Sequence, residues 1–272
     1  MLTIEQIRSY FPEAVFRKNP EGVLVEYLQY ELLDSVFKNP GAEELSFIGG
    51  TAIRILHQSI RFSEDLDFDN FGLSFEEFKS LLDKACRDMA YKGFVVEYRM
   101  VERGAFHCYI RFPGILYKTG ISPDRGRKIL IQVDTEAKEK NYTPQTILLN
   151  RFGIFRRLIA PPPGVLLARK MMAVLFRKTE KGRDLFDVSL LIGITDPDFD
   201  YVEKSLDIEK NEFLKMFTAR LDELNLDSLA RDVEPFLFEP EQRERVLYFR
   251  EMWSGGRQAE GSCRQSVQLQ HK

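Results

Sequence analysis

The chain contains little cysteine and little histidine. Its 272 residues include three cysteines, at positions 86, 108 and 263, and three histidines, at positions 57, 107 and 271. The cysteines are odd in number and no two are spaced as C-x-x-C, which argues against a disulfide framework and against a structural zinc site. Free thiols are typical of a reducing compartment. We interpret His57 and His107 as packing or surface residues.

Long apolar runs are also missing. Nothing approaches the roughly 20 consecutive apolar residues of a membrane span. The first residues, MLTIEQIRSYFPEAVF, show no basic start followed by an apolar run, so we expect no secretory signal. The net charge of -3 gives no general attraction to nucleic acid or to anionic membranes. We therefore expect a soluble, cytoplasmic protein without a membrane partner, in which any nucleic-acid binding requires a local basic patch.

Helix-like and strand-like segments alternate in the first part of the chain. From residue 22 the pattern predicts a helix, a short strand ending in two glycines, a helix directly after them, an alternating strand and an amphipathic helix, over residues 22–37, 44–50, 51–58, 65–70 and 75–93. Three β-rich segments follow, over residues 94–102, 105–113 and 128–137. This order favours a mixed sheet with helices packed on it.

The segment PPPG at residues 161–164 is the clearest boundary, and the pattern after it is almost wholly helical. The predicted fold class is therefore an α/β (α+β) core with a mixed sheet, followed by a mostly helical C-terminal domain. We place the core at residues 1–158, the helical domain at 159–253, and a polar, disordered tail at 254–272. The active site is expected in the cleft between the two domains.

The stretch GGTAIRILHQSIRFSEDLDFD, residues 49–69, carries the clearest chemical signal. Side chains of a strand alternate between its two faces, so Asp65 and Asp67 should point to one side while Leu66 and Phe68 point into the core. Two neighbouring carboxylates are stable when a cation compensates them, and oxygen ligands select Mg²⁺, with Mn²⁺ as the alternative.

The turn Gly49-Gly50-Thr51 lies upstream, at a predicted helix start. Backbone N–H groups, the helix dipole and a hydroxyl can bind a triphosphate there without obstruction by side chains. An Asp-x-Asp pair alone is common in turns and caps, and two glycines alone are weak evidence. Glycine turn, helix and acidic strand in this order predict phosphoryl or nucleotidyl transfer.

A third carboxylate would complete a two-metal site and accept the proton of the nucleophile. Asp134 is the best candidate, because it follows the alternating apolar residues of the segment KILIQVDTEA. Glu136 lies on the same face of that strand and is the alternative. Arg61 and Ser63 flank the acidic pair and are candidates for nucleotide binding.

The blocks GGTAIRIL, RFSEDLDFD and LLARKMMAVLFRKTEKGRDLFDV closely resemble the AbiEii/AbiGii-type nucleotidyltransferases, which include the MenT toxins. That family belongs to the DNA-polymerase-β-like superfamily. The resemblance covers residues roughly 20–195 in ordered blocks. It implies that Gly50 and Thr51 contact the triphosphate, that Asp65 and Asp67 hold metal ions, that Lys170 neutralises phosphate charge and that Asp184 completes the site. For Asp134 the match is looser.

The resemblance also implies a biological role. Members of the family are toxins of toxin–antitoxin and phage-defence systems, and some transfer nucleotides to the 3′ end of tRNA. For this chain it implies a magnesium-dependent transfer of NMP from an NTP to an RNA acceptor, tRNA foremost, and a cognate antitoxin as partner. Two alternatives stay open: a small-molecule or protein acceptor, and an inactive nucleotide-binding module.

A basic run lies around the third block. Residues 151–183 contain nine Lys or Arg and one acid, Glu180. In a chain that is acidic overall, this predicts a positive region suited to a triphosphate or to the tRNA backbone. The alternative is a solvated helix face. Asp184 and Asp187 lie one helical turn apart, and either could instead cap the helix after Gly182.

Overall fold

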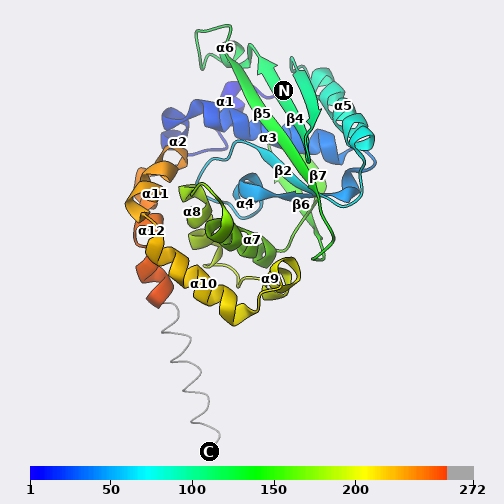
Figure 1. Cartoon of the computed structure of the whole chain (residues 1–272). Coiled ribbons are helices and arrows are strands. Elements are labelled where there is room, and N and C mark those ends of the chain that lie inside the picture. The colour runs from blue at the N-terminus through cyan, green and yellow to red at the C-terminus, as the bar shows by residue number, and fades with distance from the viewer. Residues whose placement is uncertain (256–272) are drawn as a thin grey trace, which may run out of the picture. The chain divides into compact units, whose positions relative to one another are not determined.

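A computed structural model describes residues 1–255 of the chain. These residues form two compact units, one from Met1 to Pro162 and the second from Pro163 onward (Figure 1). Residues 249–255 are helical, so the first two positions of the predicted tail belong to a helix. The rest of that tail lies outside the described residues. Within residues 1–255, no helix is long and apolar enough to cross a membrane.

The first unit is built on a five-stranded mixed sheet with the strand order β1-β2-β5-β4-β3. Strands β2 and β5 are parallel, and the other neighbouring pairs are antiparallel. The strands are β1 (Leu45–Ile48), β2 (Leu66–Asn70), β3 (Glu97–Glu102), β4 (Phe106–Pro113) and β5 (Lys128–Ala137). This mixed sheet confirms the predicted fold class for the first part of the chain.

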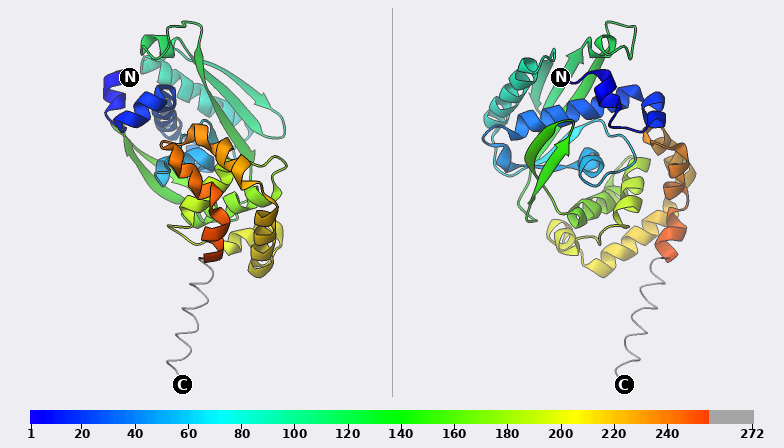
Figure 2. Two further views of the ribbon diagram at one scale, coloured as in Figure 1. Left: turned by 90° about the vertical axis from the view of Figure 1, so that its left-hand side faces the viewer. Right: turned by 180° about the vertical axis from the view of Figure 1, so that it is seen from behind.

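Six α-helices accompany the sheet: α1 (Ile4–Arg8), α2 (Glu13–Lys18), α3 (Pro20–Phe37), α4 (Gly49–Leu56), α5 (Phe75–Tyr91) and α6 (Ile115–Lys118). Helix α5 starts in a capping box, in which Ser74 and Glu77 each accept a hydrogen bond from the backbone N–H of the other. Helices α3 and α5 pack against each other on one face of the sheet. The strands lie in front of α3 in Figure 1, and α3 lies in front of them when viewed from behind in Figure 2.

A β-hairpin completes the first unit and was not predicted. It consists of β6 (Gln145–Arg151) and β7 (Ile154–Ala160), and β7 packs against α3 and β1. Its two-residue turn has positive φ at both Phe152 (57°) and Gly153 (77°). This turn normally carries Asn-Gly or Asp-Gly. Phe152 occupies the first position of the turn in place of Asn or Asp, so the sequence does not show the usual turn signal. The ring of Phe152 is buried in the core.

The second unit is helical, as predicted for the C-terminal part of the chain. Its α-helices are α7 (Pro163–Phe176), α8 (Gly182–Leu191), α9 (Phe199–Leu206), α10 (Lys210–Glu223), α11 (Leu226–Val233) and α12 (Glu244–Leu247). Helix α8 packs against α7, α11 and α12. Only glycine fits at position 182, because an added Cβ would lie 1.9 Å from the carbonyl oxygen of Leu229. The backbone of α11 therefore closely approaches the start of α8.

Candidate active site

The glycine turn at the start of α4, directly after β1, lies against an acidic side chain. Gly49 has a φ of +81°, and a Cβ built on it would lie 2.2 Å from Oδ2 of Asp67. Both the backbone conformation and the close approach require glycine here. Helix α4 begins at Gly49 itself, so the prediction of a helix starting after the glycines was wrong by two residues. The turn and the acidic strand thus form one structure.

The second glycine of the turn is surrounded by the two residues predicted to flank the acidic pair. A Cβ on Gly50 would lie 2.6 Å from Nη2 of Arg61 and 2.9 Å from Oγ of Ser63. Arg61 is only 1% exposed, and its Nη1 donates a hydrogen bond to the carbonyl oxygen of Phe62 at 2.9 Å. The Arg61 guanidinium therefore supports the turn from inside the protein. Direct nucleotide binding by this side chain, as predicted, does not fit its burial.

The side chain of Thr51 is fully buried, and its hydroxyl donates a hydrogen bond to the backbone carbonyl of Asp65. The hydroxyl therefore helps to fix the position of Asp65, and the predicted contact of Thr51 with a triphosphate falls to its backbone N–H. No side chain caps the start of α4, which leaves the backbone N–H groups of the glycine turn to bind an anion.

The acidic pair lies at the start of β2. Leu66 and Phe68 are buried, as the alternation predicts, while Asp65 is exposed and Asp67 is half-buried. The strand begins at Leu66, so Asp65 immediately precedes it and is held by the bond from Thr51. Both carboxylates are accessible to solvent, which a site for an exchangeable cation requires.

The strand register brings Asp134 beside this pair. In the parallel pairing of β2 with β5, Asp67 lies opposite Asp134, whereas Glu136 lies opposite Asp69. The residues just before them, Leu66 and Val133, also pair and are both buried. Asp67 and Asp134 therefore point to the same, open face of the sheet. Of the two candidates for a third carboxylate, Asp134 is the immediate neighbour of Asp67.

His107 is a residue that sequence analysis missed. Its Nδ1 lies 2.7 Å from Oδ1 of Asp134, and the two residues are opposite each other on β4 and β5. Gln132 also donates from Nε2 to both oxygens of Asp134, at 2.7 and 3.0 Å. The prediction that His107 is a packing or surface residue did not include this contact. The alternation of residues 106–113 indicates the sheet face on which His107 lies. Its contact with Asp134 depends on the register of β4 against β5, which the sequence does not reveal.

The three carboxylates fit a hard divalent cation in donor type and in register. Among the described residues, however, no group of three acidic, histidine or cysteine side chains is close enough together to hold a metal ion. Asp134 is instead held by His107 and Gln132. Its side chain is 29% exposed.

A second acidic cluster lies between helices α7 and α8 of the second unit. Nζ of Lys170 lies 2.9 Å from Oδ1 of Asp184 and 2.8 Å from Oδ2 of Asp187, and Arg177 also forms an ion pair with Asp184. Asp184 and Asp187 are buried, with exposed fractions of 3% and 0%. Lys170 and Arg177 thus compensate the charges of Asp184 and Asp187. The ion pair with Lys170 means that Asp187 does more than cap a helix.

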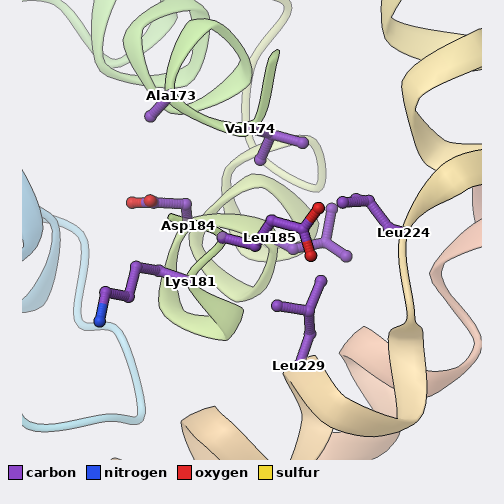
Figure 3. A pocket seen from close by; sticks show the side chains of 8 residues that line it. Ala173, Val174, Lys181, Asp184, Leu185, Leu224 and Leu229 are labelled. Atoms are coloured by element: carbon purple, nitrogen blue, oxygen red, sulfur yellow. The ribbon is translucent and has the colours of Figure 1, made fainter. Parts of the chain in front are cut away.

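A small cavity lies close to this cluster. Beside Asp184 lies a cavity of about 10 Å³, which is at the limit for a single water molecule. Figure 3 shows Leu185, Leu224 and Leu229 gathered around it, with the carboxylate of Asp184 turned away from them. A cavity of about 330 Å³ lies in the first unit, between the first helices and the loop after α6, and no predicted site residue lines it.

Several positive charges of the basic run, residues 151–183, are paired within the fold. Arg151 donates from Nη2 to the backbone carbonyl of Tyr10 at 2.6 Å, and Nε of Arg156 lies 2.8 Å from Oδ1 of Asp34. Lys170 and Arg177 are bound to the acids of α8. Much of the predicted positive charge is therefore used within each unit.

Comparison with known proteins gives a consistent picture. The sequence model of the family described as "Nucleotidyl transferase AbiEii toxin, Type IV TA system" matches residues 31–259. This range includes the glycine turn, the acidic strands and most of the helical unit. No curated protein matches the chain.

Solved structures share the fold. JHP933 from Helicobacter pylori has a TM-score of 0.52 and 15% identity, over 91% of this chain and 98% of that protein. Another H. pylori protein, described provisionally as a nucleotidyltransferase, has a TM-score of 0.53 and 15% identity, over 89% of this chain and 95% of that one. At this identity the similarity establishes the fold alone.

Proposed function

Because the chain belongs to the AbiEii family of nucleotidyl transferase toxins of type IV toxin–antitoxin systems, we propose that it transfers NMP from an NTP to the 3′ end of an RNA, with tRNA as the foremost acceptor. The chain is a nucleotidyltransferase, and its family implies an NTP substrate and a cognate antitoxin. The proposal consists of the RNA acceptor, the magnesium requirement, the residue roles and the cytoplasmic location.

One observation supports this proposal most strongly. The uncapped start of α4 touches Asp67 through Gly49, and Asp67 lies opposite Asp134 on the next strand. A helix start with open N–H groups attracts phosphate. Carboxylates immediately beside it can hold the cation that accompanies a triphosphate. The proposed phosphate site and the proposed cation site are thus adjacent, as nucleotidyl transfer requires.

In the proposed reaction, the oxygen of the acceptor hydroxyl attacks the α-phosphorus of the NTP. A bond forms between that oxygen and phosphorus, the bond from phosphorus to the α,β-bridging oxygen breaks, and pyrophosphate leaves. Asp134 accepts the proton of the hydroxyl, and His107 orients the Asp134 carboxylate. Mg²⁺, or Mn²⁺ in its place, would be held by Asp65, Asp67 and Asp134 and would supply Lewis-acid stabilisation of the developing charge.

The remaining residues have supporting roles in this proposal. The backbone N–H groups of Gly49, Gly50 and Thr51 bind phosphate oxygens, while the Arg61 and Ser63 side chains hold the turn in shape. The predicted roles of Lys170 in neutralising phosphate charge and of Asp184 in completing the site stay predictions. Lys170 is paired with Asp184 and Asp187, so phosphate binding by Lys170 requires that it leave both acids.

Labelled nucleotides test this function. Purified protein is incubated with each of the four α-³²P-labelled NTPs, Mg²⁺ and total cellular RNA, and the labelled macromolecules are separated. We expect label in RNA from one preferred NTP, none with EDTA, and none from the Asp67→Asn variant. Label in protein or in a small molecule would refute the RNA acceptor, and no label in any fraction would refute the transferase activity.

The third carboxylate is tested by a matched pair of variants. Asp134→Asn and Glu136→Gln each replace one acid by its amide, two residues apart on the same strand face. We expect Asp134→Asn to abolish labelling, because its carboxylate neighbours Asp67. Glu136→Gln should retain labelling, since that carboxylate forms an ion pair with Lys138 at 3.0 Å. The opposite pattern would assign the third carboxylate to Glu136.

A further inference from the structure

The sheet of the first unit has one covered face and one open face. Residues 108, 110 and 112 of β4, and 129, 131 and 133 of β5, are buried on the face where α3 and α5 pack. The alternate residues point to the other face, on which Asp67 and Asp134 lie. Beyond Asp134, that face carries the side chains of Glu97, Arg99, Val101, His107, Tyr109, Arg111, Lys128, Leu130 and Gln132.

Two arginines on this face are not neutralised. Arg99 lies opposite Tyr109, and Arg111 follows two residues further along β4. Neither guanidinium forms a hydrogen bond or an ion pair with any residue in the range 1–255. The nearby acid Glu97 is already paired with Lys128 at 2.8 Å. The face therefore has an excess of positive charge beside the catalytic carboxylates.

An aromatic ring lies between these charges and the site. Tyr109 is half-buried, and within the described part of the chain its ring and its hydroxyl have no side-chain partner. It follows His107 by two residues, so His107, Tyr109 and Arg111 form a row along β4. At about 3.3 Å per residue, this row extends roughly 13 Å away from Asp134. Leu130, opposite Arg111, is 47% exposed and adds an apolar surface at its far end.

We propose that this row, together with Arg99, binds the single-stranded 3′ end of the acceptor RNA and delivers its terminal hydroxyl to Asp134. The inference rests on the proposed transferase function of the same site. A base stacks on the ring of Tyr109, and Arg99 and Arg111 contact the phosphates on either side. Unpaired guanidinium groups around a partly exposed aromatic ring are features that bind single-stranded nucleic acid.

The geometry selects a single strand over other acceptors. A base can stack on Tyr109 only if it is not already paired within a duplex. A small-molecule acceptor at Asp134 would not reach Arg111, which lies four residues beyond His107, the neighbour of Asp134, on β4. The row thus predicts that the enzyme requires unpaired nucleotides before the terminal hydroxyl.

The test uses a fluorescein-labelled RNA hairpin with a short single-stranded 3′ overhang, and the same hairpin with a blunt end. Binding is measured by fluorescence anisotropy over a range of salt concentrations. The variants are Arg99→Gln/Arg111→Gln and Tyr109→Leu. The control is Lys84→Gln/Arg87→Gln, which removes two charges from exposed positions on α5, the helix on the covered face.

We expect the wild type and the control to bind the overhang hairpin more tightly than the blunt one. Arg99→Gln/Arg111→Gln should weaken binding of the overhang at least tenfold. The same variant should lower the slope of log affinity against log salt by about 1.4, since each phosphate that is no longer neutralised accounts for about 0.7. Tyr109→Leu should weaken binding about tenfold without changing the slope.

Transfer kinetics separate this inference from the proposed function. If the wild type labels RNA, we expect Arg99→Gln/Arg111→Gln to raise KM for the overhang hairpin at least tenfold with little change in kcat. RNA labelling by the wild type, together with variants that bind and react like the control, would overturn the inference alone and leave the face to a protein partner. A wild type that labels no RNA would overturn the proposed function, and this inference with it.

Discussion

The two units contain acidic clusters of opposite character. In the first unit, Asp65 is exposed, and Asp67 and Asp134 are half-buried on an open sheet face. In the second unit, Asp184 and Asp187 are buried and are bonded to Lys170. Both clusters lie in the region that the family model matches. The two clusters therefore differ in accessibility: the acids of the first are open to solvent, whereas those of the second are buried against Lys170.

The energetics of the two clusters differ accordingly. Removing a carboxylate from water is costly unless a partner charge compensates it, so the buried acids of α8 need Lys170 in order to fold. Accessible carboxylates keep much of their hydration and repel one another in the absence of a cation. Substitutions in the first cluster should therefore affect chemistry, and substitutions in the second should affect stability.

The largest effect is expected for the accessible acids. Asp67→Asn removes a ligand for the cation, so the rate of NMP transfer should fall by about 100- to 1,000-fold or more. The melting temperature should change little, because the substitution keeps the shape of a side chain that is only half-buried. Transfer assays and calorimetry on the same preparation measure both. Activity close to that of the wild type would place the chemistry elsewhere.

The buried cluster should respond in the opposite way. Lys170→Met leaves two buried carboxylates undercompensated, and we expect it to destabilise the second unit by about 3 kcal/mol. Urea unfolding followed by circular dichroism measures this. In the double variant Lys170→Met/Asp187→Leu one of these charges is also removed, so part of the stability should return. Unchanged stability with weaker NTP binding would instead assign Lys170 to the phosphates.

The glycine turn links chemistry and stability. Gly49→Ala would place a Cβ 2.2 Å from Oδ2 of Asp67 and would put alanine at a φ of +81°. We expect a loss of about 1–2 kcal/mol in stability and a fall in transfer rate comparable to that of Asp67→Asn. Gly153→Ala, which has a similar φ of +77° and nothing within 4 Å, is the control. It should lose stability but keep its activity when compared at equal folded fraction.

A smaller effect is expected at His107. His107→Ala leaves Asp134 in place but removes the imidazole that orients it, and such supporting contacts are typically worth about 10- to 100-fold in activity or metal affinity. The Mg²⁺ concentration needed for half-maximal transfer should rise. If His107→Ala changes stability but neither the rate nor the Mg²⁺ dependence, the contact is structural only.

The smallest change in stability is expected for Asp34, a half-buried acid of the first unit that is paired with two cations. Burial alone would raise the pKa of Asp34, but hydrogen bonds from Lys92 and Arg156 outweigh burial and hold the pKa below its ordinary value. A lowered carboxyl pKa contributes stability above the unfolded-state value, about 3.9, and the contribution is lost as pH falls through the folded-state value. Stability measured between pH 5 and 2 should therefore fall more steeply in the wild type than in Asp34→Asn.

Local patterns were sufficient to predict part of the local geometry around the acidic pair. The alternation around Leu66 predicted that Asp65 and Asp67 point away from the core, because the two faces of a strand differ in burial at every second residue. Two glycines before an amphipathic segment predicted the turn into α4. The mixed sheet and the helical C-terminal part follow from such patterns as well.

What the sequence could not reveal depends on contacts between distant segments. The choice between Asp134 and Glu136 depends on the register of β5 against β2. The contact of His107 with Asp134 depends on the register of β4. Arg156 was counted as part of a basic patch, but its partner Asp34 lies 122 positions earlier in the chain.

Binding of Mn²⁺, measured by electron paramagnetic resonance, tests the central contrast most directly. Titrations compare the wild type with Asp67→Asn and Asp187→Asn, all verified to be folded. If the accessible acids hold the cation, Asp67→Asn should lose Mn²⁺ binding, whereas Asp187→Asn should bind Mn²⁺ as the wild type does. Mn²⁺ binding that survives in Asp67→Asn, or that is lost in folded Asp187→Asn, would contradict the account.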